Sequence, residues 1–85
     1  MKYSPFIEVM EVDGEFSLHI QGHAFSNHVK QIFVENFHLP PMMEELNENG
    51  YIFTFSKNID EYTFYRHLKT LTVPYLIQKH KELQK

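Results

Sequence analysis

An Asp-Gly pair between two alternating segments limits the fold of this chain more than any other sequence feature. Apolar and polar residues alternate from Ile7 to Met10 and from Phe16 to Gln21, a pattern typical of half-buried β-strands. Asp13 and Gly14 stand between the two segments, and these residue types tolerate the positive φ that both central positions of a tight hairpin turn require. The sequence therefore predicts a β-hairpin near the N-terminus.

The spacing of apolar residues becomes helical after this hairpin. From Ala24 to Phe37 they recur three and four positions apart, which predicts a helix with one apolar face. That face consists of Phe25, Val29, Ile32, Phe33 and Phe37. We expect Ser26 to cap the start of the helix and Leu39-Pro40-Pro41 to end it, because proline has no N–H to donate and disfavours helix at the residue before it.

A second pair of predicted strands follows the prolines. Met42 to Leu46 forms a short strand, Asn47 to Gly50 a turn, and Tyr51 to Ser56 a longer alternating strand. Exposed rings on such a strand can stack on RNA bases, but that use needs cations around them, and only Lys57 is close. We therefore expect the rings of this strand to lie in the core; they are Tyr51, Phe53 and Phe55. The opposite face is expected to be mixed, as in a weak or hydrated protein interface, and its predicted residues are Ser17, His19, Gln21, Ile52, Thr54 and Ser56.

Two helices are predicted in the C-terminal part of the chain. Asn58 and Glu61 form a capping box, in which each side chain satisfies a backbone donor at a helix start. We expect this helix to run from Ile59 to about Leu71. Pro74 separates it from a last amphipathic helix over Tyr75 to Gln84.

This order of elements, ββαββα followed by a short C-terminal helix, predicts the α+β class. We expect a two-layer sandwich, with a four-stranded antiparallel sheet and the helices on one of its faces. The 85 residues suffice for a single compact domain, 1–85. The predicted core consists of Phe16, Leu18, Phe25, Val29, Ile32, Phe33, Phe53, Phe55, Phe64 and Leu68.

Charge is divided unevenly along the chain. Residues 1–56 carry two lysines and eight acidic residues, a net charge of −6, whereas residues 57–85 carry six cations and three acidic residues, a net charge of +3. One interpretation is that solvated faces of opposite sign belong to one domain. The other is that a basic helical surface contacts an acidic partner protein, since complementary charge speeds encounter. For this second interpretation the predicted partner-binding residues are Arg66, Lys69, Lys79 and Tyr75.

The residues most able to carry chemistry are six histidines, yet their spacing predicts no site. His19 and His23 are four residues apart across a strand end, where they are separated by about 13 Å, and no pair lies on one helical turn. The segment Tyr65 to His67 has the residue types of a small ribonuclease, but neighbours on a helix point about 100° apart. The chain has no cysteine, which excludes thiolate metal sites and cysteine nucleophiles. We therefore predict no catalytic residue, no metal and no cofactor.

The sequence favours a small non-catalytic interaction or regulatory module that binds another protein or itself. Uncovered sheet edges predict a possible homodimer. The alternatives are a nucleic-acid-associated protein that uses the basic C-terminal helices, which the acidic first part disfavours, and a histidine-dependent hydrolase or metal enzyme. No apolar run approaches the ~20 residues of a membrane helix, and Met1 to Pro5 do not begin a signal peptide, so a cytoplasmic protein without membrane contact is expected.

Overall fold

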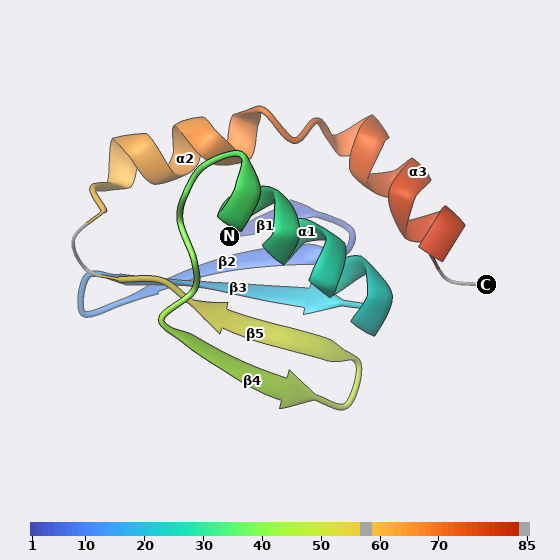
Figure 1. Ribbon diagram of the computed structural model, residues 1–85, viewed down its shortest axis with the longest axis horizontal. Coiled ribbons are helices and arrows are strands. Elements are labelled where there is room, and N and C mark those ends of the chain that lie inside the picture. Colours follow the sequence, from blue (N-terminus) through green and yellow to red (C-terminus); the bar gives the residue numbers. More distant parts are fainter. Residues whose placement is uncertain (57–58, 84–85) are drawn as a thin grey trace.

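A five-stranded antiparallel sheet forms one layer of the molecule, and three helices form the other (Figure 1). In the computed structural model, which describes residues 1–56 and 59–83, the strands lie in the order β1-β2-β3-β5-β4. The strands are β1 (Lys2–Ser4), β2 (Ile7–Val12), β3 (Glu15–Gln21), β4 (Met43–Asn47) and β5 (Gly50–Thr54). The helices are α1 (His23–Glu35), α2 (Glu61–Lys69) and α3 (Val73–Leu83).

The α+β class and the antiparallel sheet are as predicted, but the number of strands is not. The chain runs βββαββαα, and the fifth strand is β1, which pairs with β2 at one edge of the sheet. The sequence pattern missed β1 because three residues are too few to show alternation. Its register with β2 is irregular, with Lys2 opposite Glu8 and Ser4 opposite Ile7.

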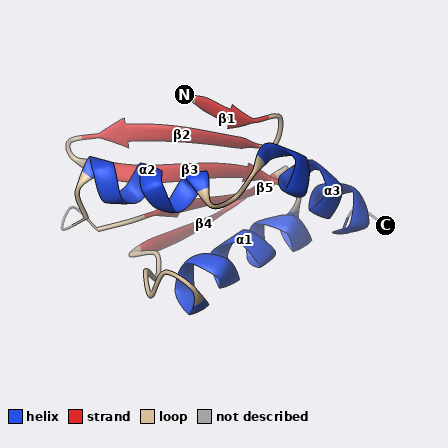
Figure 2. Ribbon diagram, turned by 90° about the horizontal axis from the view of Figure 1, so that it is seen from above, coloured by secondary structure: helices blue, strands red, loops and turns tan. Residues whose placement is uncertain are grey.

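The three helices cover the same face of the sheet (Figure 2), and the aromatic core lies between the two layers. Six phenylalanines are at most 2% exposed: Phe16, Phe25, Phe33, Phe53, Phe55 and Phe64. The rings of Phe16 and Phe64 stack with centroids 4.5 Å apart, and those of Phe33 and Phe55 lie 5.1 Å apart. All ten predicted core residues are buried except Ile32, which is partly exposed. The strand alternation is also as predicted, because Phe53 and Phe55 are buried and Tyr51 packs against the core.

Two glycine positions fix the register of the sheet. Asp13 and Gly14 have φ angles of 52° and 81°, so the turn between β2 and β3 has the left-handed backbone that the Asp-Gly pair predicted. At Gly50 a Cβ atom would collide with the backbone carbonyl of Ile20 on β3. Only glycine allows β5 to approach β3 this closely, so Gly50 holds the β4–β5 hairpin in place.

Ser26 does not cap α1, which corrects the sequence prediction. The helix begins at His23 after Gly22, whose φ is 90°, and no side chain caps it. The Ser26 hydroxyl is 2.6 Å from the Gly22 carbonyl oxygen and 3.1 Å from the Ile20 carbonyl oxygen, so it bonds α1 to the end of β3. The helix ends at Glu35, before the proline segment, as expected.

The C-terminal helices begin at other residues than predicted. The N-cap of α2 is Asp60, whose carboxylate accepts a 2.8 Å hydrogen bond from the Thr63 N–H, while the predicted cap Asn58 lies outside the described residues. Helix α3 begins at Val73, so Pro74 lies in its first turn, where a missing N–H costs little. Its predicted end, Gln84, also lies outside the described residues. No helix in residues 1–56 and 59–83 combines the length and apolar character that crossing a membrane requires.

Candidate functional site

The sheet face that the helices leave uncovered is the first candidate binding surface. The strand register aligns its side chains in rows, and the central row runs from Met10 on β2 through Ser17 and Thr54 to Met43 on β4. The hydroxyl oxygens of Ser17 and Thr54 are 3.3 Å apart, within hydrogen-bond distance. Met10 and Met43 are 41% and 57% exposed. Because methionine side chains are flexible and polarizable, this row can adapt to an apolar surface of another molecule.

A neighbouring row on the same face carries charge. From β1 to β4 this row consists of Lys2, Glu8, His19, Ile52 and Glu45. Glu15 follows on β3, opposite Val12. In the part of the chain that the structure describes, none of these carboxylates forms an ion pair. The uncovered face therefore has three carboxylates and one lysine, and it is acidic.

A hollow of about 300 Å³ lies at one end of this face. Its lining includes the polar residues Lys2, Ser4, Glu8, His19, Gln21, Asn47 and Asn49. Glu8 and His19 are opposite each other, as a general base and the group that orients it would be, but no hydrogen bond joins them within the described chain. The hollow thus offers hydrogen-bonding groups to a ligand without an aligned pair for proton transfer.

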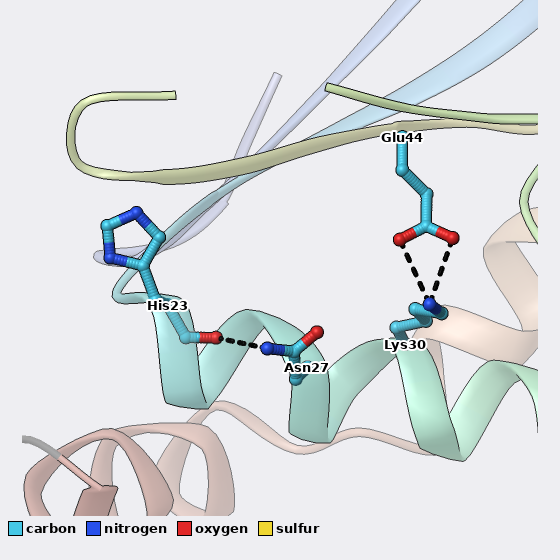
Figure 3. Close-up of polar contacts among 4 residues, drawn as sticks. All are labelled: His23, Asn27, Lys30 and Glu44. Atoms are coloured by element: carbon cyan, nitrogen blue, oxygen red, sulfur yellow. Dashed lines mark hydrogen bonds and ion pairs between the residues drawn. The ribbon is translucent and has the colours of Figure 1, made fainter. Parts of the chain in front are cut away.

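Edge strand β4 is the second candidate surface, because all five of its residues are exposed. Helix α1 holds both ends of the strand. At one end His23 Nε2 donates to the Asn47 carbonyl oxygen at 3.1 Å. At the other end Lys30 Nζ lies 2.9 Å from both carboxylate oxygens of Glu44 (Figure 3). Between them the Asn27 amide donates to the His23 carbonyl oxygen. The strand is therefore fixed from the helix side while its outer side is open.

The histidines that are close in sequence are separated in the structure. His19 lies on the uncovered face, His23 contacts the end of β4, and His28 Nε2 is 3.0 Å from the Tyr75 hydroxyl. Burial lowers the pKa of His28, and the positive charge of Lys79 lowers it further. Among the described residues, no group of three or more His, Asp and Glu side chains is placed to hold a metal ion.

The four predicted partner-binding residues lie on two helices, Arg66 and Lys69 on α2 and Tyr75 and Lys79 on α3. Arg66 and Lys69 line a hollow on α2, together with the acidic residues Asp60 and Glu61. On α3, Lys79 Nζ lies 6.0 Å from the centre of the Tyr75 ring. Tyr75 also contacts α1 through His28, and Lys79 forms an ion pair with Glu82 at 3.4 Å. The cations on both helices thus have acidic residues beside them.

The segment Tyr65 to His67 does not converge on one point. The Tyr65 ring packs edge-on against Phe16 with centroids 5.9 Å apart, whereas the His67 ring stacks on Phe37 at 4.4 Å. Arg66, between them, is exposed. Burial raises the pKa of Tyr65, so its hydroxyl stays protonated near neutral pH.

Sequence reasoning found only the middle of the uncovered face. The predicted neighbours are confirmed, since Ser17 lies opposite Thr54 and His19 opposite Ile52. The contribution of the outer strands to this face was missed, because Met10 and Val12 are apolar although they lie on the opposite side of β2 from Ile7 and Val9, and because Met43 to Asn47 lacks an apolar alternation. The signal available for β2 was Glu8, which places even-numbered residues of that strand toward solvent.

Comparison with known proteins does not assign the chain to a family. No protein-family model, no curated protein and no solved structure matches the chain. The function is therefore inferred from the uncovered face, the hollow and the edge strand alone.

Proposed function

We propose that this chain is a small non-catalytic module that binds another protein through the uncovered face of its sheet. The observation that carries the proposal is the central row, in which Met10 and Met43 flank the hydrogen-bonded pair Ser17 and Thr54. With strands about 4.8 Å apart, this row extends for roughly 15 Å across the sheet. A monomer commonly exposes single apolar side chains, but an aligned row on an uncovered sheet layer is typical of a contact surface.

The charge of the face indicates the chemistry of the partner. Glu8, Glu15 and Glu45 surround the methionine row, and Lys2 is the cation among the aligned residues. Complementary potential would favour a partner with an apolar centre and basic residues around it. The proposed contact therefore uses the sheet layer, whereas the charge pattern of the sequence had pointed to the basic helices of the other layer.

Nucleic-acid association is less well supported than protein binding. A phosphate backbone requires several cations on one continuous surface. Arg66 and Lys69 lie beside Asp60 and Glu61, and Lys79 is paired with Glu82, so cations and carboxylates alternate on this layer.

Affinity capture from the native cell tests the proposal. The wild-type chain is compared with a Met10→Lys/Met43→Lys variant of the face and with an Arg66→Glu/Lys69→Glu variant of the helix layer, each captured mixture being identified by mass spectrometry. We expect one partner to be retained by the wild type and the helix variant and lost by the face variant. Loss with the helix variant alone would instead assign binding to the α2 and α3 residues predicted from the sequence.

A further inference from the structure

We propose that β4 accepts an extended, lysine- or arginine-bearing segment of the partner as a sixth strand of the sheet. This inference rests on the proposed function and describes how the partner is held. The occupant is a β-strand of another protein, which hydrogen-bonds to the outer side of β4.

The first support is that β4 is a free edge. It pairs with β5 on one side, and within residues 1–56 and 59–83 no segment pairs with its other side. An edge strand directs the N–H and C=O groups of every second residue away from the sheet, where only water or another strand can satisfy them. An extended peptide would satisfy them with a complete ladder.

The second support is that the strand is already held in position. His23 and Lys30 of α1 contact Asn47 and Glu44 near the two ends of β4. The close approach at Gly50 fixes the β5 side. A preformed edge loses little freedom when a partner binds, and this favours affinity.

Interface area also favours the use of the edge. Five strands spaced about 4.8 Å apart and about 17 Å long on average give the uncovered face a flat area of roughly 300–400 Å². A stable interface covers about 800 Å² on each partner. A partner that adds a strand to β4 and continues across the uncovered face would bury a larger surface area than the face alone provides.

A second copy of the chain fits this edge poorly. Two β4 strands related by a twofold axis can continue the sheet, with the helices on one side, in three registers that overlap at least three residues of the strand, and each of these places carboxylates opposite each other. A register centred on Glu45 pairs it with its own copy, one centred on Glu44 does the same, and one centred on Leu46 pairs Glu44 with Glu48. Like charges directly opposite each other destabilise a strand pair.

The same side chains define the segment that would fit. Lys30 already neutralises Glu44, whereas in the described chain Glu45 and Glu48 have no cation within ion-pair distance. Leu46 is 69% exposed and has no apolar cover on its outer side. The matching strand therefore carries an apolar residue opposite Leu46 and Lys or Arg at two places, opposite Glu45 and next to Glu48, which lies in the turn directly after β4.

A synthetic peptide of this pattern, acetyl-Lys-Thr-Val-Lys-Thr-Val-Thr-amide, is the probe. Titrated into the ¹⁵N-labelled full chain at physiological salt, it is expected to shift the amide resonances of β4 and not those of β1. Two further versions carry N-methyl groups on alternate amides, one on odd and one on even residues. Strand addition predicts that one version binds like the parent and the other does not bind, because only one set of amides faces β4.

Two protein variants with the same change in charge test the role of Glu45. Glu45→Lys is expected to weaken peptide binding by roughly three- to tenfold, since it replaces an attractive cross-strand pair with a repulsive one. Glu35→Lys, at the exposed end of α1, is expected to change it by less than about twofold. Equal binding of both N-methylated peptides, or equal effects of both variants, would reduce the interaction to general charge attraction and overturn the inference.

Two outcomes separate this inference from the proposed function. If the peptide does not bind while the captured partner still depends on Met10 and Met43, strand addition is wrong and the protein-binding face stands. If the peptide binds but capture is insensitive to those methionines, the edge is right and the face is wrong. Dimerisation of the free chain that Glu45→Lys alters would assign the edge to a second copy and overturn the inference.

Discussion

The two edges of the sheet are finished in different ways. At the β1 edge the N-terminal amine donates to the Val9 carbonyl oxygen at 2.6 Å, and the Tyr3 hydroxyl lies 2.6 Å from the Leu68 and 2.9 Å from the Leu71 carbonyl oxygen of the helix layer. Helix α3 packs against the same strand. At the other edge all five residues of β4 are exposed, and α1 contacts it by an ion pair and one hydrogen bond.

This difference shows that β4 is the open edge of the sheet, whereas the β1 edge is covered. Unpaired strand edges invite association, and proteins commonly shorten or cover them. Here β1 has only three residues and is covered, whereas β4 has five residues and is protected from self-pairing by its carboxylates alone. The charges at β4 discourage a second copy without closing the edge to a basic strand.

The largest expected effect comes from replacing Gly50, which attaches the open edge to the rest of the sheet. Gly50→Ala should lower the free energy of unfolding by at least about 3 kcal/mol, because the new Cβ meets the Ile20 backbone, which cannot move aside as a side chain could. Gly14→Ala is the control, since its Cβ would meet no atom within 4 Å and only the left-handed backbone costs roughly 1–2 kcal/mol. Urea denaturation measures both; similar losses would show that the β3–β5 approach is no tighter than a free turn.

The sequence was sufficient for the strands whose own pattern decides their structure. Alternation predicted β2, β3 and β5, and the apolar spacing predicted α1, because burial of one face settles these elements locally. It was insufficient for β1, whose pairing depends on contacts of Tyr3 with residues far along the chain. The same reason explains Ser26, whose hydroxyl bonds back to β3 instead of capping its helix.

The candidate site was less accessible to sequence reasoning than the fold. Charge along the chain drew attention to the basic helices, where Arg66 lies beside Asp60 and Glu61, and Lys79 is paired with Glu82. The methionine row depends on register between distant strands, since Met10 and Met43 belong to β2 and β4. No local pattern contains that alignment.

A smaller effect is expected at the covered edge. Tyr3→Phe removes the hydroxyl that donates to the carbonyl oxygens of Leu68, in the last turn of α2, and of Leu71, just after it, and should cost about 1–3 kcal/mol. Tyr62→Phe, at an exposed tyrosine on the same helix layer, should change the free energy of unfolding by less than about 0.5 kcal/mol. Denaturant titration of both variants decides the point, and an unchanged midpoint for Tyr3→Phe would mean that β1 is covered by packing alone.

Acid should loosen the covered edge before the open one. Burial lowers the pKa of His28, with further lowering by Lys79 opposed by Glu82, and burial also lowers the pKa of His80, whose ring stacks on Phe6 at 3.5 Å. The folded state therefore binds fewer protons than the unfolded state just below the ordinary histidine pKa of about 6.5. This contribution to stability is complete above that pH and is lost as the pH falls through it.

Both histidines lie at contacts of α3, the helix that packs against β1. Denaturation at pH 7.5 and 5.5 should show lower stability at the lower pH, with faster amide exchange in β1 and α3. The double variant His28→Gln/His80→Gln should flatten the dependence of stability on pH. His38→Asn, at an exposed histidine between α1 and β4, should leave this dependence unchanged. An unchanged slope in the double variant would show that His28 and His80 do not carry the acid sensitivity.

The smallest effect is expected at the ion pair that holds the open edge. Lys30→Met removes the contact with Glu44, and because both side chains are partly exposed the free energy of unfolding should change by less than about 1 kcal/mol. The informative measurement is amide hydrogen exchange, which reports local opening: β4 should exchange a few times faster while β1 is unchanged. Lys79→Met is the matched control, because it removes the other ion pair, with Glu82, at a helix that does not contact β4. If both variants leave β4 exchange unaltered, the hydrogen bond from His23 and the pairing with β5 are enough to hold the strand, and the edge is preformed without the α1 ion pair.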